Sequence, residues 1–183
     1  MKELSLNILD IAENSVKAGA RLVQIFINEN NEQLALEIID DGCGMKADML
    51  ENVMNPFCTT RTTRKVGLGI PLMKLASEQT GGSFNISSRH ESEFPCDHGT
   101  VVNATFFKTH IDFTPLGDVI STIVTLIQGS PEMDFLFKHI LNGRCVTLDT
   151  RELREVLGEA VPLNVPDVLC WIKENLQGQY NAL

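Results

Sequence analysis

Three short stretches of the sequence carry residue types that could bind a ligand. The first is the run Asp-Asp-Gly-Cys-Gly-Met at residues 40–45, which follows an apolar, strand-like segment. The carboxylate of Asp40 could accept a hydrogen bond from an exocyclic amine such as N6 of adenine, and Gly42 and Gly44 would let the backbone approach the ring. Met45 could pack against the same base. Taken alone, the pattern also fits an ordinary tight turn.

The second stretch is a stripe along the first predicted helix. Asp10, Asn14 and Lys17 are spaced i, i+4 and i+7, so their side chains share one face. The amide oxygen of Asn14 suits magnesium, Asp10 could orient or deprotonate a water near a terminal phosphate, and Lys17 could meet a phosphate as a point charge. From this helix alone, the solvated face of an amphipathic helix is the favoured interpretation.

The third stretch is a glycine pair at the start of another helical pattern. Gly67, Leu68 and Gly69 would place backbone N–H groups and the helix dipole where an anion could bind. Thr60 and Arg64 lie in the polar, basic loop just before, which could close over phosphates. The alternative is a solvated surface loop.

A fourth, weaker signal precedes the strand near residue 100. Thr100, which follows Gly99, could offer a hydroxyl near a bound base. For this pair alone, an ordinary loop glycine followed by a β-branched strand residue is the favoured interpretation.

Hydrophobic periodicity predicts the elements that must position these residues. A composition shift near Thr109 divides the chain into residues 1–108 and a smaller appendage, residues 109–183. We expect the tail after Gln177 to fray. The predicted elements are a helix at 3–17, a strand hairpin at 21–28 and 33–39, helices at 46–54 and 68–80, strands at 83–88 and 100–107, a helix at 116–127, a strand at 133–140, and helices at 150–157 and 166–176.

Composition excludes several classes of function. The 183-residue chain has a net charge of −9 and 43% hydrophobic residues, which argues for a globular core and against binding to nucleic acid or an anionic membrane. It contains no apolar run long enough to span a bilayer and no signal peptide at its start. Its five cysteines form no C-x-x-C pair, so zinc is not expected, and their odd number suits a cytoplasmic protein with reduced thiols.

The order and spacing of these stretches resemble a known superfamily of ATPases. It includes DNA gyrase B, the MutL mismatch-repair proteins, the large heat-shock chaperone and the sensor histidine kinases. The resemblance covers about residues 3–108 and is nearest to the histidine kinases and anti-sigma-factor kinases. Its motifs are the N box at residues 10–15 with Gly19-Ala20, the G1 box at 40–44, the kinase-type F box at 55–60, the G2 box at 66–70 and, more loosely, a last box at 98–100.

This resemblance implies a two-layer α/β sandwich, with helices on one face of a mixed, mostly antiparallel sheet, plus the small α/β appendage. It also implies that ATP and Mg²⁺ are the cofactors. By resemblance, Asn14 would hold the magnesium, Asp40 would read adenine, and Gly67 and Gly69 would touch the phosphates. Lys17 stands where histidine kinases often carry a phosphate-contacting lysine.

The sequence departs from the superfamily at two points. Hydrolysing members usually carry glutamate one turn before the magnesium-binding asparagine, and Asp10 is one methylene shorter, so we expect hydrolysis to be slow. Sensor kinases carry their phosphoacceptor histidine on a helical hairpin before the N box, and only two residues precede the first helix here. The chain's own histidines read as ordinary surface or loop residues and not as phosphoacceptors, and His98 has the best claim to lie near the ligand; they are His90, His98, His110 and His139.

We therefore expect an ATP-binding module that transfers phosphate to a separate, unidentified protein, as anti-sigma-factor kinases do. The alternatives are a nucleotide-gated interaction module with little or no turnover and, less favoured, a slow ATPase. A homodimer is a further expectation, because relatives often dimerise.

Overall fold

The computed structural model describes residues 3–53, 69–158 and 161–183. Four residues of the predicted site, Thr60, Arg64, Gly67 and Leu68, lie outside the described residues, as does the F box.

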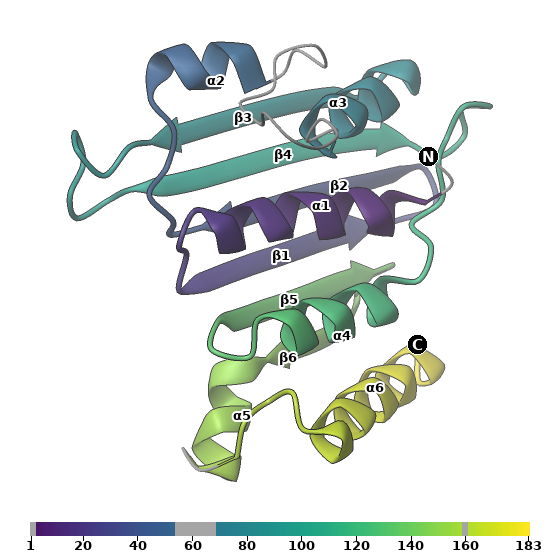
Figure 1. Cartoon of the computed structure of the whole chain (residues 1–183). Coiled ribbons are helices and arrows are strands. Elements are labelled where there is room, and N and C mark those ends of the chain that lie inside the picture. Colours follow the sequence, from purple (N-terminus) through teal and green to yellow (C-terminus); the bar gives the residue numbers. More distant parts are fainter. Residues whose placement is uncertain (1–2, 54–68, 159–160) are drawn as a thin grey trace.

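Helices and strands follow the predicted order closely (Figure 1). They are α1 (Leu4–Lys17), β1 (Leu22–Glu29), β2 (Gln33–Asp40), α2 (Ala47–Val53), α3 (Gly69–Gln79), β3 (Ser83–Arg89), β4 (Gly99–Phe107), α4 (Val119–Gly129), β5 (Asp134–Leu141), β6 (Arg144–Asp149), α5 (Thr150–Leu157) and α6 (Pro166–Asn181).

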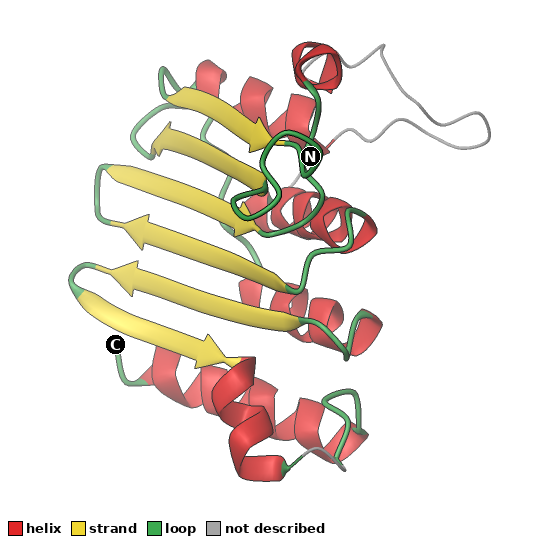
Figure 2. Ribbon diagram, turned by 90° about the vertical axis from the view of Figure 1, so that its left-hand side faces the viewer, coloured by secondary structure: helices red, strands yellow, loops and turns green. Residues whose placement is uncertain are grey.

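The strands form one six-stranded sheet in the order β3-β4-β2-β1-β5-β6. Every neighbouring pair is antiparallel except β1 and β5, which are parallel. Figure 2 shows α1, α3 and α4 stacked against one face of this sheet, with the opposite face open. The predicted two-layer sandwich with a mixed, mostly antiparallel sheet is confirmed.

The alternation of buried apolar residues with more exposed residues along the strands explains why the helices cover only one face of the sheet. Val23, Ile25 and Ile27 of β1 are buried beneath the helices, while the residues between them are more exposed. The helix α1 presents Leu4 and Ile8 to the same core, both fully buried. Apolar residues at period two on the strands and at period 3.6 on the helix therefore meet in one layer.

The C-terminal segment continues the same sheet. Strand β5 pairs in parallel with β1, and a tight turn at Asn142 and Gly143, both with positive φ, returns the chain into β6. Strand β6 was absent from the sequence-based prediction. The proposed division between residues 1–108 and 109–183 stays a prediction about folding units, although both parts contribute strands to one sheet.

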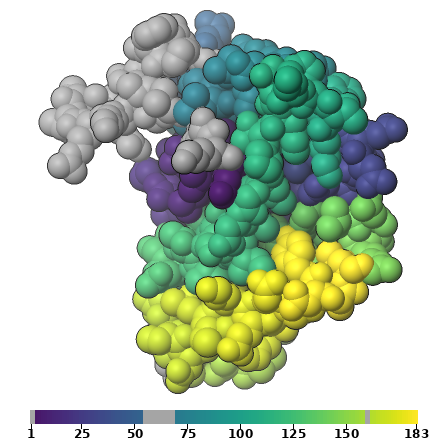
Figure 3. Space-filling model, turned by 90° about the vertical axis from the view of Figure 1, so that its right-hand side faces the viewer, coloured from purple at the N-terminus to yellow at the C-terminus, as the bar shows by residue number. Residues whose placement is uncertain are grey.

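Helix α6 runs on to Asn181, so the prediction of a frayed tail after Gln177 is wrong. The hydroxyl of Tyr180 lies 2.7 Å from Nδ1 of the buried His139 on β5, and Leu176 is fully buried. Figure 3 shows the C-terminal residues, in yellow, packed against the green segments that precede them in the chain. This packing is what keeps the last turns of the helix in place.

A partly buried ionic cluster surrounds the same histidine. Nε2 of His139 lies 3.3 Å from the carboxylate of Glu29 at the end of β1, and that carboxylate also pairs with Lys108. The bond from His139, followed by that from Lys108, holds the pKa of Glu29 below its ordinary value, although burial opposes this shift. Burial raises the pKa of Tyr180, and the nearby charge of Glu29 raises it further.

Candidate functional site

A row of polar side chains crosses three neighbouring strands. Ser88 on β3 is the register partner of Thr100 on β4, and Thr100 is in turn the partner of Asp40 on β2. These residues lie on the helix-covered face, because Ile86 and Ile38, two residues away along their strands, are buried there. The polar row therefore marks the end of the apolar core.

Asp40 is fixed by two hydrogen bonds from different elements. The hydroxyl of Ser15, a buried residue of α1, donates to Oδ2 at 2.7 Å. The backbone N–H of Gly42 donates to Oδ1 at 3.0 Å. Each carboxylate oxygen can accept more than one hydrogen bond, so Asp40 is oriented and still able to accept from a ligand.

The glycine loop after β2 is held at both sides by backbone bonds. Cys43 donates its N–H to the carbonyl of Ala18 at the end of α1, at 2.9 Å, and accepts from the N–H of Glu91 at 2.9 Å. Gly44 has a φ of 69°, and a Cβ at that position would overlap the carbonyl of Arg89. Glycine is therefore required there both for its conformation and for space.

The other end of the polar row fixes the exit of this loop. The hydroxyl of Ser88 accepts the N–H of Met45 at 2.8 Å and lies 2.9 Å from the hydroxyl of Thr100. Nδ1 of His98 lies 2.6 Å from the carbonyl of Gly42. The loop is thus attached to α1 on one side and to the β3–β4 hairpin on the other.

The start of α3 lies against α1 at Asp10. A Cβ added to Gly69 would lie 2.7 Å from Cβ of Asp10, closer than such atoms approach in proteins. Gly69 is therefore what allows the N-terminus of α3 to meet the helix at this point. Gly42 makes a similar approach to Ala18, with a built Cβ at 2.9 Å from that methyl group, so the glycine loop after β2 and the start of α3 both contact α1.

The predicted stripe of α1, formed by Asp10, Asn14 and Lys17, extends along the helix from the contact with Gly69 toward the contact with Gly42. Asp10 is exposed and Asn14 is partly buried. Lys17 is exposed and forms an i, i+4 ion pair with Glu13 at 3.2 Å. To reach a phosphate, Lys17 has to leave this partner, and exposed pairs of this kind cost less than about 1 kcal/mol to break.

The described residues of the site offer few protein ligands to a metal ion. Within residues 3–53, 69–158 and 161–183, no group of three or more His, Cys, Asp or Glu side chains is arranged to hold a metal ion. Mg²⁺ is commonly held by one or two protein oxygens together with phosphates and waters. The amide oxygen of Asn14 is of the right type for that arrangement.

Two residues of the site, Ser15 and Ser88, were not predicted as ligand-binding or positioning residues. Ser15 follows the predicted metal ligand directly, but its contact with Asp40 depends on how α1 lies on the sheet. Ser88 could have been found from strand register, because pairing Phe106 with Leu34 carries Thr100 to Asp40, and pairing Phe84 with Ala104 carries Ser88 to Thr100.

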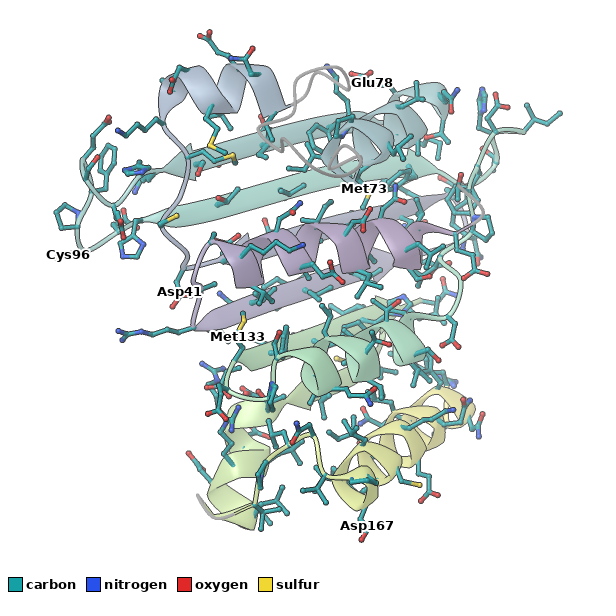
Figure 4. All side chains as sticks on the ribbon, viewed as in Figure 1. Asp41, Met73, Glu78, Cys96, Met133 and Asp167 are labelled. Carbon is teal, nitrogen blue, oxygen red and sulfur yellow. The ribbon has the colours of Figure 1, made fainter. Side chains whose placement is uncertain are left out.

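The surface has one hollow beside the polar row and another away from it. One, of about 550 Å³, is lined by Asp41, Cys43, Cys96 and His98, among others, on the outer side of the glycine loop. Figure 4 shows Asp41 and Cys96 at the same end of the sheet. The other, of about 410 Å³, lies on the open sheet face around Phe26. Neither includes Asp40 or Asn14.

Comparison with known proteins places the chain in a family. The profile of the histidine kinase-, DNA gyrase B- and HSP90-like ATPases matches residues 2–110, more than half of the sequence. The chain therefore belongs to this family, and the matched residues form an ATP-binding domain of its type.

Curated relatives match over the same domain. The sensor histidine kinase CitA of Klebsiella pneumoniae is 27% identical over 85 residues, which are 45% of this chain and 16% of that protein. The sensor protein KdpD of Clostridium acetobutylicum is 31% identical over 87 residues, 45% of this chain and 10% of that protein. The cell-division control histidine kinase PdhS of Brucella anthropi is 26% identical over 124 residues, 61% of this chain and 11% of that protein. The chain thus spans between 10% and 16% of these relatives.

Solved structures share the fold over a longer stretch. The MutL ATPase domain of Aquifex aeolicus, solved with ADP, superposes with a TM-score of 0.57 at 16% identity, covering 86% of this chain and 69% of that one. The N-terminal domain of a DNA repair protein gives a TM-score of 0.54 at 15% identity, covering 87% of this chain and 58% of that one. These likenesses extend beyond residue 110.

The described helices include no candidate for a membrane-spanning segment. None of them combines the length and the apolar character that a bilayer crossing requires.

Proposed function

We propose that this protein binds ATP with Mg²⁺ between α1, the glycine loop after β2 and the start of α3, and transfers the terminal phosphoryl group to a separate protein. The observation that carries the proposal is the convergence of these three pieces. Asp40 is bonded to Ser15 of α1, and the start of α3 touches the same helix at Asp10.

Each piece would bind a different part of the nucleotide. Asp40 would accept a hydrogen bond from the adenine amine, with Thr100 beside it and Met45 packing on the ring. Asn14 would hold the magnesium, which neutralises phosphate charge when bound. Phosphoryl transfer needs mainly positioning and charge neutralisation, so a site built this way can support it.

The phosphates would lie at the N-terminus of α3. The backbone N–H of Gly69 and the helix dipole supply positive potential there. From the sequence alone we add Gly67, Leu68, Thr60 and Arg64 to this part of the site.

The location of the histidines argues against a helical phosphoacceptor within residues 1–183. None of the chain's four histidines lies on a helix. His139 is 2% exposed on β5, and Nδ1 of His98 is engaged with the carbonyl of Gly42. His90 and His110 lie in connecting segments. The histidines of this chain are therefore poorly placed to act as helical phosphoacceptors.

A nucleotide-gated interaction module with little turnover is the second candidate. It is favoured by the carboxylate of Asp10, which is exposed on α1 and one methylene shorter than the glutamate expected in hydrolysing members. In this alternative, ATP binding would change the surface offered to a partner.

Slow ATP hydrolysis with Asp10 as the base is the third candidate. A homodimer and a cytoplasmic location stay predictions.

Transfer of radiolabel from γ-³²P-ATP distinguishes these candidates. The purified chain is incubated with labelled ATP, Mg²⁺ and proteins that co-purify with it. We expect label on a second protein, lost in Asn14→Ala and kept in Asn85→Ala, a control on the exposed side of β3. ATP binding without label or free phosphate would contradict the kinase and favour the module. Phosphate release abolished by Asp10→Ala would instead indicate an ATPase.

A further inference from the structure

Ser88 has no role in the nucleotide site as it was predicted from the sequence, yet its hydroxyl joins three other groups of that site. It accepts the N–H of Met45 at 2.8 Å, lies 3.0 Å from the carbonyl of Gly99, and lies 2.9 Å from the hydroxyl of Thr100. Because Ser88 is opposite Thr100 and Thr100 is opposite Asp40, this hydroxyl lies at the outer end of the polar row.

Counting protons gives the one set of directions that satisfies every group in these bonds. A serine hydroxyl has one hydrogen to donate and two lone pairs. The carbonyl of Gly99 can only accept, so the hydrogen of Ser88 satisfies it. Thr100 carries a hydrogen of its own and donates it to Ser88. In this arrangement all four groups are satisfied, as partly buried polar groups generally are.

The consequence concerns what Thr100 offers to a ligand. With its hydrogen directed at Ser88, its hydroxyl presents only lone pairs on the remaining side. Asp40, held by Ser15 and Gly42, also presents only lone pairs. A base edge that carries an amine donor meets acceptors here, whereas a base with a carbonyl in that place meets repulsion and loses a hydrogen bond.

We propose that Ser88 is a positioning residue for base selection, an inference that rests on the proposed nucleotide site. Ser88 orients the hydroxyl of Thr100 as an acceptor and thereby favours adenine over hypoxanthine. Ser88 need not touch the base. Without it, the hydroxyl of Thr100 is free to turn and donate to a carbonyl at the same place.

The test compares binding of ATP and ITP, which differ at the amine and the adjacent ring nitrogen. Calorimetry with Mg²⁺ is carried out on the full chain and on Ser88→Ala, Thr100→Val and the double variant. We expect Ser88→Ala to lower the ratio of ATP to ITP affinity about tenfold, the equivalent of one hydrogen bond. Because Ser88 acts through Thr100, the double variant should lose no more selectivity than Thr100→Val alone.

Controls separate this role from a structural one. Ser87→Ala, on the exposed side of the same strand, should leave the ratio unchanged, and Thr100→Ser, which keeps the hydroxyl, should retain most of the selectivity. The proposal would be overturned if Ser88→Ala weakened the binding of ATP and of ITP equally. It would also be overturned if the losses of selectivity in the two single variants added up in the double variant. If Ser88→Ala fails to fold, unchanged selectivity in Thr100→Val overturns it. Absence of ATP binding to the unmodified chain would instead refute the proposed function.

Discussion

At the scale of single residues, the site is organised by hydroxyl groups that the sequence pattern did not single out. Ser15 and Ser88 each join a residue of the predicted site to a different element, the first through Asp40 and the second through Met45. The predicted ligand-binding residues therefore depend on neighbours that do not themselves need to contact the nucleotide. Loss of one such bond leaves a partly buried acceptor or donor unpaired, at a cost of about 1–3 kcal/mol.

Gly69→Ala tests the contact that brings α3 to α1. The new methyl group would meet Cβ of Asp10, and neither atom can move without shifting a helix. We expect the free energy of unfolding to fall by about 1–3 kcal/mol and ATP affinity to fall with it. Chemical denaturation and calorimetry measure the two effects.

The matched control for this change is Gly178→Ala. Gly178 is exposed within α6, and no atom lies within 4 Å of its built Cβ. This variant should gain about 0.5–1 kcal/mol from helix propensity and bind ATP normally. A Gly69→Ala protein as stable as the unmodified chain would contradict the close approach.

At the scale of elements, segments with a strong period of apolar residues could be predicted from the sequence. A strand that is evident only from its pairing with a neighbour could not. The alternation of apolar residues in β1 and β2 and the apolar stripe of α1 were enough to locate these elements and the ligand residues they carry. Strand β6 has six residues, and only Val146 and Leu148 are buried, so its alternation is too short to identify it alone. Its place becomes evident only through its pairing with β5.

The last turns of α6 were unpredictable for a similar reason. Local sequence near Gln177 and Gly178 favours fraying, but Tyr180 is held by His139, which is distant in sequence. Contacts between elements overrode local propensity at this point. The contact of Ser15 with Asp40 was likewise hidden, because it depends on how α1 lies on the sheet.

Glu29→Gln tests the ionic cluster that joins β1 to β5 and to Lys108, the residue after β4. The pKa of Glu29 is lowered in the folded protein, so its stabilising effect is present above the ordinary value of 4.5 and is lost as the pH falls through the folded value. We expect the variant to be less stable by about 1–2 kcal/mol at pH 7, with a difference that narrows below pH 4.5. Urea denaturation at several pH values measures this.

Glu32→Gln provides the control for that series. Glu32 is an exposed carboxylate in the turn after β1, so its substitution should change stability little at any pH. A Glu29→Gln deficit that stays constant from pH 7 to pH 3 would show that the effect does not come from the carboxylate's charge.

At the scale of the whole molecule, the parallel pairing of β1 with β5 joins the family domain to the C-terminal segment. Phe135 and Phe137 of β5 are buried in the same core as Val23 and Ile25 of β1. Removing β5 would expose this apolar surface and an unpaired strand edge. We therefore expect the two segments to unfold together.

The single tryptophan makes this expectation measurable. Trp171 lies on α6, so its fluorescence reports on the C-terminal segment, while circular dichroism reports on the whole chain. The two denaturation curves should coincide, and ATP with Mg²⁺ should shift both equally by mass action. Separate midpoints, or a shift by ATP in only one curve, would show that residues 109–183 unfold independently.

The central claim is that Asp40 reads an adenine amine, and calorimetric titration of ATP with Mg²⁺ into Asp40→Asn tests it most directly. We expect ATP affinity to fall about 10- to 100-fold and the preference for ATP over GTP to shrink, because a bond to a charged acceptor is lost. Asp41→Asn is the control, since that residue instead accepts the backbone N–H groups of Arg21 and Leu22 through an oxygen that asparagine keeps. Unchanged affinity and base preference in Asp40→Asn would contradict the account.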